Sequence, residues 1–284
     1  MEFSEEIGGH KKTVVEKNIY RMILFESFKH IESICKKYGI ENYTVNNNGL
    51  VDVKYGVNLS NRRLDKFPLN FGTVTGIFFC PNNKLRTLEG SPREVGGTFD
   101  CSNNLLTTLE GSPIKVSDFN CSNNQLTTLE GSPKEVIGDF ICYNNQLRSL
   151  EGCPTEVRGV FNCNNNQLTS LEGSPTSLGG DFYCSDNQLT TLEGSPTEVR
   201  GYFYCNNNKL RTLKGISERI DGLVIGGNPI SNISRLFKNT KQFLELLNDY
   251  NFIYNDKIIK ARFEQACLDA GIEMPKTIKD YFIV

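Results

Sequence analysis

A cysteine that recurs every 20 or 21 residues constrains the fold of this chain more than any other feature. The members of this series are Cys80, Cys101, Cys121, Cys142, Cys163, Cys184 and Cys205. A Phe stands two residues before each Cys, an Asn three residues after, and leucines five and eight residues after. A fixed period of this length over many units indicates a solenoid, in which each unit forms one turn of a coil.

Two weaker units flank the seven. VNLSNRRLDKF places Leu59 at the cysteine position, and LVIGGNPISNI places Ile225 there, so nine units are predicted. Within a unit, VSDFNCSNNQL (116–126) follows the frame L-x-x-L-x-L-x-x-N-x-L, with Val, Phe and Cys replacing three leucines. This frame is the leucine-rich-repeat pattern.

The units resemble the short leucine-rich repeats of bacterial proteins, which read L-x-x-L-P-x-x-P. The repeat consensus is similar to that of repeat proteins that bacteriophages often encode. It reads F-x-C-S-N-N-x-L-T-x-L-E-G-S-P-x-E-V-x-G. The resemblance covers roughly residues 50–235. It implies an α/β solenoid, a right-handed superhelix of about nine units of ~21 residues with a parallel sheet on one face. It also implies a phage protein that binds a host or viral protein.

Each unit is predicted to begin its core with the strand F-x-C. Side chains alternate along a strand, and the constant Phe and Cys are expected to face inward. The residues three and one before the Cys, and the residue after it, are expected to face outward. The recurring Asn is predicted to be buried and to satisfy backbone groups at the turn. Because only about eight residues remain for the opposite side, extended or short 3₁₀ segments are expected there.

The open ends of a solenoid need caps. Residues 1–46 are expected to hold an N-terminal tail and a capping helix, residues 47–235 the solenoid, and residues 236–284 a small helical C-terminal cap. An apolar helical rhythm runs from Ile19 to Cys35, and NYTVNNNGLVDVKYG predicts a hairpin at its Asn-Gly turn. Residues 234–251 and 256–271 predict amphipathic helices, and DYFIV predicts a final strand.

Composition narrows the functional classes. The formal net charge is −2, without the cationic surplus that nucleic-acid binding requires. No window of about 18 apolar residues predicts a membrane span, and the first residues lack the apolar core of a secretory signal. Packed cysteines are expected to be reduced and structural, since a linear column does not converge on a metal ion. We therefore expect a cytoplasmic protein, in the host cytoplasm if a phage encodes it, without metal or cofactor.

The outward strand positions are the expected binding face. Acidic, aliphatic and aromatic side chains gather there: Asp100, Asp118, Asp139, Asp181, Ile141, Tyr143, Tyr183, Tyr202 and Tyr204. Tyrosines are favoured contact anchors, and carboxylates steer a basic partner. The opposing interpretation is that the tyrosines follow β-propensity and the aspartates form a solvated edge. The first hypothesis is a non-enzymatic module, monomeric or weakly oligomeric, that binds an unidentified protein. Host defence factors are among the expected targets.

Two alternatives stay open. Cys267 and Asp269 resemble the Cys-Asp nucleophile of ubiquitin-ligase domains that follow the repeats of some bacterial effectors. A virion or assembly component is the other, because an edge rung can add a strand from another chain. His10 and His30 lie outside the repeats, which excludes a Cys-His or Ser-His pair there. A glutamate column is expected to be a solvated ridge without catalytic function: Glu89, Glu110, Glu130, Glu151, Glu172 and Glu193.

Overall fold

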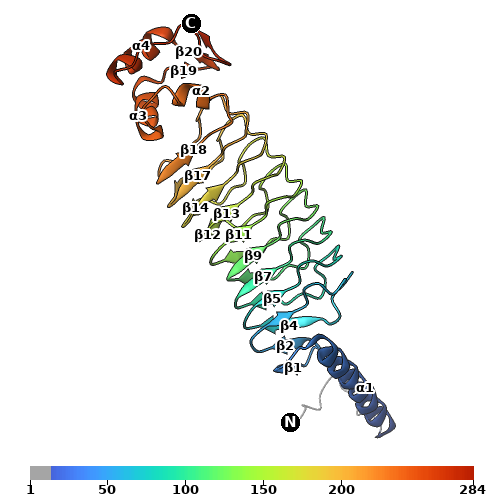
Figure 1. The fold of residues 1–284 in the computed structure, drawn as a ribbon. Helices are drawn as coiled ribbons and strands as arrows, with labels where there is room; N and C mark the ends of the chain where they lie inside the picture. Colours follow the sequence, from blue (N-terminus) through green and yellow to red (C-terminus); the bar gives the residue numbers. More distant parts are fainter. Residues whose placement is uncertain (1–13) are drawn as a thin grey trace.

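The protein is a long rod made of stacked turns of the chain, with a cap at each end (Figure 1). A computed structural model describes residues 14–284, with side chains from residue 26 onward. Helix α1 (Val14–Tyr38) lies at one end, and helices α2 (Ser231–Ser234), α3 (Thr240–Tyr250) and α4 (Lys260–Asp269) lie at the other. Between residues 43 and 228, which are described throughout, the chain forms strands and turns without a helix.

One wall of the rod is a nine-stranded sheet that contains the F-x-C strands, here called the Phe-Cys sheet. Its pairing is parallel, and Phe lies opposite Phe in successive units. Nine strands for nine units confirm the predicted count. The strands are β3 (Val57–Asn58), β5 (Phe78–Phe79), β7 (Thr98–Asp100), β9 (Asp118–Asn120), β11 (Phe140–Ile141), β13 (Phe161–Asn162), β15 (Phe182–Tyr183), β17 (Tyr202–Tyr204) and β18 (Gly222–Val224).

A second nine-stranded sheet forms the opposite wall. The sequence predicts one sheet and extended segments behind it, and the structure pairs those segments into this additional sheet. Because most of its strands are two residues long, their sequence signal is too short to recognise. The strands are β1 (Tyr43–Val45), β2 (Val51–Val53), β4 (Phe71–Val74), β6 (Glu94–Val95), β8 (Lys115–Val116), β10 (Glu135–Val136), β12 (Glu156–Val157), β14 (Ser177–Leu178) and β16 (Glu198–Val199).

The space between the two sheets is filled by columns of Phe, Cys, Leu and Val. The Phe and Cys of the F-x-C positions in all seven full units have 0% of their surface exposed, which confirms their predicted inward orientation. The rings contact one another along the rod, and Phe140 lies 5.4 Å from Phe119 and 5.3 Å from Phe161 between ring centroids. The core is therefore continuous from unit to unit.

The buried asparagines connect each turn of the coil to its neighbours. In one unit, the Asn145 side-chain amide donates to the carbonyls of Cys121 and Cys142, both at 3.1 Å. Its Oδ1 accepts from the Leu126 backbone N–H at 3.0 Å. A backbone N–H inside the core would otherwise lack an acceptor, so this side chain is part of the framework of the rod.

The column cysteines are free thiols that also hydrogen-bond between units. Cys80 Sγ donates to the carbonyl of Asp100 at 3.3 Å, and Cys163 Sγ donates to that of Tyr183 at 3.3 Å. In both cases the same carbonyl accepts the backbone N–H of the cysteine. Burial raises the pKa of Cys80 and Cys163, which keeps these thiols protonated.

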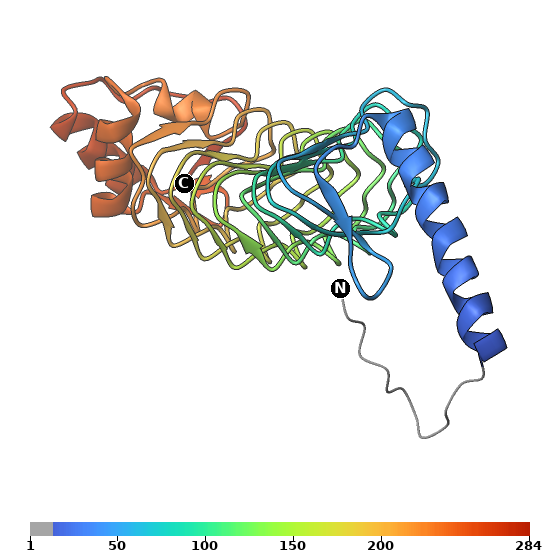
Figure 2. The ribbon, with the colours of Figure 1, turned by 90° about the horizontal axis from the view of Figure 1, so that it is seen from below.

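The N-terminal cap is a helix followed by a hairpin, as predicted. Helix α1 ends at Tyr38 and is followed by Gly39, which has a φ of 67°, and Figure 2 shows the helix extending away from the coil. Strands β1 and β2 pair antiparallel, and β2 pairs parallel with β4. The hairpin thus forms the first edge of the second sheet, next to β4. Most of the predicted N-terminal tail falls on residues 1–13, outside the described residues.

The C-terminal cap departs from the predicted helix boundaries. Helix α3 begins at Thr240, and not near residue 234, because the Asn239 side chain accepts from the Gln242 N–H and caps it there. Helix α4 begins at Lys260, because a hairpin of β19 (Ile253–Tyr254) and β20 (Lys257–Ile258) occupies the residues before it. Strand β21 (Phe282–Ile283) pairs with β20, which confirms the predicted final strand.

Arg211 anchors this cap to the last full unit. Its guanidinium donates to the carbonyl of Asp280, lies 4.0 Å from the Asp256 carboxylate, and covers the Tyr281 ring at 5.2 Å. The Asn232 side chain adds a hydrogen bond to the Asp280 carboxylate at 3.0 Å.

Among the described residues, no helix has the length and apolar character that crossing a membrane requires.

Candidate functional site

The outward surface of the Phe-Cys sheet, here called the strand face, holds all nine side chains predicted to bind a partner. Tyr202 is 49% exposed, and the others are half-buried. The residue directly after the column Cys was also predicted to face outward, but at this position Ser102, Ser122 and Ser185 are buried. Ser122, for example, donates its hydroxyl to Asn120 at 2.7 Å as the chain starts to turn inward.

Three of the four predicted tyrosines form a cluster on β15 and β17. The rings of Tyr183 and Tyr204 stack in parallel at 4.4 Å with an angle of 3°. The ring of Tyr202 lies 5.9 Å from that of Tyr204. Among the described residues, ring contacts do not extend to Tyr143. The name Tyr cluster is used below for Tyr183, Tyr202 and Tyr204.

The Tyr cluster is held in place by its neighbours. The Tyr183 hydroxyl donates to Asp181 at 2.9 Å, and partial burial together with this hydrogen bond raises the pKa of Tyr183 to about 12. The ring of Tyr202 covers Gly222, where an added Cβ would lie 2.5 Å from Cε1. Val224, 36% exposed, continues the column of Tyr183 and Tyr204 onto the last strand. Sequence reasoning missed Gly222 and Val224, although the repeat register places them opposite the tyrosines.

The aspartates of the strand face hydrogen-bond to the backbone. One carboxylate oxygen of Asp118 accepts from the Asp139 N–H at 2.9 Å, and Asp139 accepts from Val160 at 2.8 Å. Asp181 accepts from the Tyr202 N–H at 2.8 Å in the same way. These side chains therefore link successive units, which a solvated edge does not do.

Each of these aspartates requires a glycine in the following unit. A Cβ added to Gly138, Gly159 or Gly201 would overlap with the carboxylate oxygen of the Asp one unit earlier. At Gly138 the Asp118 carboxylate is the one neighbour within 3.0 Å of such a Cβ. The outward Asp and the next glycine are thus a matched pair across two turns of the coil.

We expect Gly138→Ala to lower the free energy of unfolding by about 1–3 kcal/mol, because the new methyl displaces the Asp118 carboxylate from the Asp139 N–H. Combined with Asp118→Ala, the same change should cost about 1 kcal/mol less, since the obstacle is gone. Urea unfolding of the two single variants and the double variant measures this coupling. Gly226→Ala is the control, because no atom lies within 4 Å of its added Cβ. Additive effects at 118 and 138 would contradict the pairing.

The glutamate column is an exposed ridge at the turn after the strands. All six of its members are exposed. Glu193 is paired with Lys214 at 2.7 Å, whereas Lys115 pairs with Glu135 of the second sheet at 2.9 Å. The ridge offers no enclosed pair of carboxylates, which acid–base catalysis requires.

The Cys-Asp pair of α4 lacks the geometry of a nucleophile. Cys267 is 1% exposed, and burial raises the pKa of its thiol. The Asp269 carboxylate accepts hydrogen bonds from Tyr250 and Gln265, which lower the pKa of Asp269. A reactive cysteine requires an exposed thiolate with a lowered pKa, which is the opposite arrangement.

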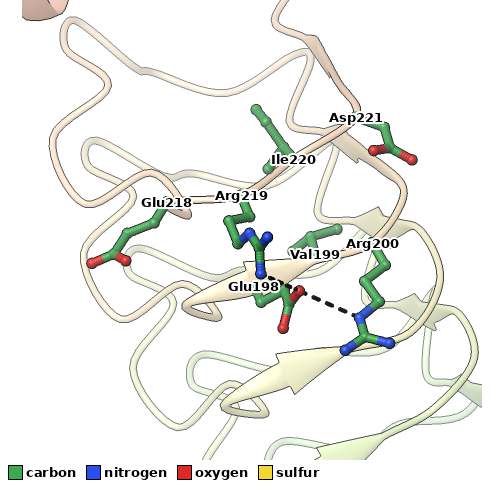
Figure 3. Close-up of a pocket in the computed structure, with 7 residues that line it drawn as sticks. All are labelled: Glu198, Val199, Arg200, Glu218, Arg219, Ile220 and Asp221. Atoms are coloured by element: carbon green, nitrogen blue, oxygen red, sulfur yellow. Dashed lines mark hydrogen bonds and ion pairs between the residues drawn. The ribbon is translucent and has the colours of Figure 1, made fainter.

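A shallow hollow lies at the end of the second sheet, beside β16 (Figure 3). Its floor is Glu198, whose Oε1 lies 3.3 Å from a guanidinium nitrogen of Arg200 and 3.3 Å from one of Arg219. Both arginines are largely exposed, and their shared carboxylate already partners them. The hollow therefore offers surface charge without an enclosed binding site.

The repeats, the in-register parallel strands and the small end caps define a leucine-rich-repeat solenoid. Neither a protein-family model nor a curated protein matches the sequence. Among solved structures, the chain is similar to YopM, a leucine-rich effector protein from Yersinia pestis, with a TM-score of 0.46 and 22% identity. The match covers 61% of this chain and 49% of that one, so the chain spans about half the length of this solved relative.

Proposed function

We propose that this solenoid is a protein-interaction module that binds its partner through the strand face, with the Tyr cluster as the anchor. The observation that carries the proposal is the cluster itself, because the ring of Tyr204 contacts both other tyrosines on a rigid sheet. Binding hot spots are enriched in tyrosine, and a pre-ordered side chain loses little entropy on binding. Tyr202 is half exposed, although a ring of this size gains most from being covered.

The proposed origin, location and partner class come from the amino-acid sequence of the repeat unit. Its resemblance to phage repeat proteins supports a phage-encoded module that works in the host cytoplasm, as a monomer or weak oligomer. Its partner is then a host or viral protein, with host defence factors among the candidates. Catalysis is not part of the proposal, because Cys267 is buried and its neighbour Asp269 is engaged elsewhere. No observation favours the assembly role.

Site-specific photo-crosslinking tests the proposed face. A photoreactive phenylalanine replaces Tyr204 on the strand face or Thr127 on the exposed turn, and the protein is irradiated in bacterial cells. We expect a discrete crosslinked protein from position 204 that position 127 does not yield. Changing Tyr183 and Tyr202 to Ala in the same chain should lower that yield about tenfold or more, because hot-spot truncations cost at least 2 kcal/mol. Equal products from both positions, or none from position 204, would contradict the proposal.

A further inference from the structure

We propose that the partner docks a lysine- or arginine-bearing segment on the strand face, with its cations on the aspartates and its apolar part on the Tyr cluster. This inference rests on the proposed function and adds the chemistry of the partner. The strand face is an uncovered sheet surface, and the charge that it carries identifies the occupant.

The strand face excludes cations. Of the chain's 31 lysines and arginines, none occupies an outward strand position between Ile77 and Gly226. The same positions hold four aspartates, and none of the four has an ion-pair partner within 4.0 Å among the described residues. Elsewhere on the rod, acidic and basic side chains do pair, as Lys115 does with Glu135. The strand face therefore carries carboxylates with no lysine or arginine among them.

The charge of Asp100 exceeds what the fold requires. Asp100 accepts from the N–H of Ser102 at 2.9 Å. Asn120 and Asn162 occupy the equivalent position in other units and accept the equivalent hydrogen bond at 3.1 Å. A neutral amide therefore accepts this backbone hydrogen bond as well as a carboxylate does. The negative charge of Asp100 is not needed for the sheet.

The surface offers hydrogen-bond acceptors where a partner would meet it. The Tyr183 hydroxyl donates its hydrogen bond to Asp181, so the lone pairs of that hydroxyl are left to accept hydrogen bonds from a partner. Each carboxylate keeps lone pairs beyond those used by the backbone N–H groups. Ammonium and guanidinium groups carry donors only, which makes them the complementary chemistry. Because these carboxylates are half-buried, their attraction for a cation is screened less than on an open surface.

The spacing suits an extended segment that lies along the rod. Asp118, Asp139 and Asp181 share one column, and neighbouring strands lie about 4.8 Å apart. Asp181 is therefore about 14 Å from Asp118 along the axis, close to the span of four residues of an extended chain. Such a segment would reach the Tyr cluster at the end where Asp181 lies.

Synthetic peptides provide the probe. A fluorescent peptide of alternating arginine and serine, about twelve residues long to match the nine rungs, is titrated against the full chain, beside a glutamate–serine peptide. In low salt we expect the arginine peptide to bind and the glutamate peptide not to. Binding should weaken as salt rises, since screening acts on the exposed part of the contact.

Two matched variants locate the site. The first replaces Asp100, Asp118, Asp139 and Asp181 with Asn, which keeps the backbone acceptors. The second replaces Glu110, Glu130, Glu151 and Glu172 of the ridge with Gln, which removes the same charge from another surface. We expect the Asn variant to bind the arginine peptide about tenfold or more weakly, and the Gln variant less than about threefold. Urea unfolding verifies that both variants are folded.

Equal losses in the two variants, or full binding by the Asn variant, would overturn the inference. The crosslink from position 204 separates this failure from that of the proposed function. If that crosslink persists at full yield in the Asn background, the strand face binds a protein for reasons other than charge, and the inference alone is wrong. If the crosslink falls together with peptide affinity, both are supported.

Discussion

Raising the pH above 9 is expected to unfold the solenoid over a narrow range. The seven column thiols are fully or almost fully buried, and burial raises the pKa of each from its ordinary value of 9.0. For Cys205, at the end of the column, the pKa rises to about 12. The unfolded chain therefore loses these protons at a lower pH than the folded chain does.

The sign and size of the effect follow from proton linkage. Below pH 9 both states hold the protons, and the thiols leave stability unchanged. Above it the unfolded state holds fewer protons, so the free energy of unfolding falls by about 1.4 kcal/mol per thiol for each pH unit. Seven thiols together give roughly 10 kcal/mol per pH unit, which is comparable with the whole stability of a typical domain.

Urea unfolding at a series of pH values, in the presence of a reductant and followed by circular dichroism, measures this slope. The Cys121→Ala variant is the control, because it removes one buried thiol and should reduce the slope by about 1.4 kcal/mol per pH unit. An unchanged urea midpoint from pH 8 to pH 10 would show that the column is not held protonated.

Asn145→Leu is expected to lower the free energy of unfolding by about 3–5 kcal/mol. The substitution removes the acceptor of the Leu126 N–H and two donors to the carbonyls of Cys121 and Cys142. Water cannot replace these partners, because Asn145 is 9% exposed and its surroundings are packed. Urea unfolding measures the loss, and hydrogen exchange at the Leu126 amide reports on the site itself.

Gln146→Leu is the matched control, because it introduces the same side chain at the next residue, which is exposed. We expect that variant to lie within about 0.5 kcal/mol of the parent protein. Similar losses in the two variants would mean that the buried amide contributes little, and that leucine itself disturbs the turn.

The repeat predicted most of the fold, for reasons that individual residues show. Phe140 and Cys142 recur at a fixed spacing while Ile141 varies, and that contrast was enough to orient the strand. The second sheet was not predicted, because a pair such as Glu135 and Val136 carries no alternation to recognise. At the C-terminal cap, the hairpin turn with Asn255 at positive φ lies inside an apolar pattern that also suits a helix.

The candidate site could be predicted only in part. The register alone places Tyr183 opposite Tyr204, and their stacking follows from that position. The backbone hydrogen bonds of Asp118 could not be predicted, because they depend on where the next turn presents its N–H. Asn144 was missed as well: its φ of 53° requires a residue that tolerates the left-handed region, which explains the first Asn of each Asn-Asn pair.

The pairing of an outward Asp with the next glycine has a consequence for how such a gene can change. Tandem units invite duplication and deletion by recombination, and a uniform coil would accept any order. Here a unit with Asp directly before its strand Phe, such as Asp118, must be followed by a unit with glycine two residues before its strand Phe, such as Gly138. Two units are reached after 20 residues instead of 21, at Cys121 and at Ile225, and both lack this glycine. They carry Ser117 and Asp221 there, and they follow Thr98 and Tyr202 rather than an Asp. Shuffled arrays that break this rule should be lost by selection, so the succession of units is itself inherited information.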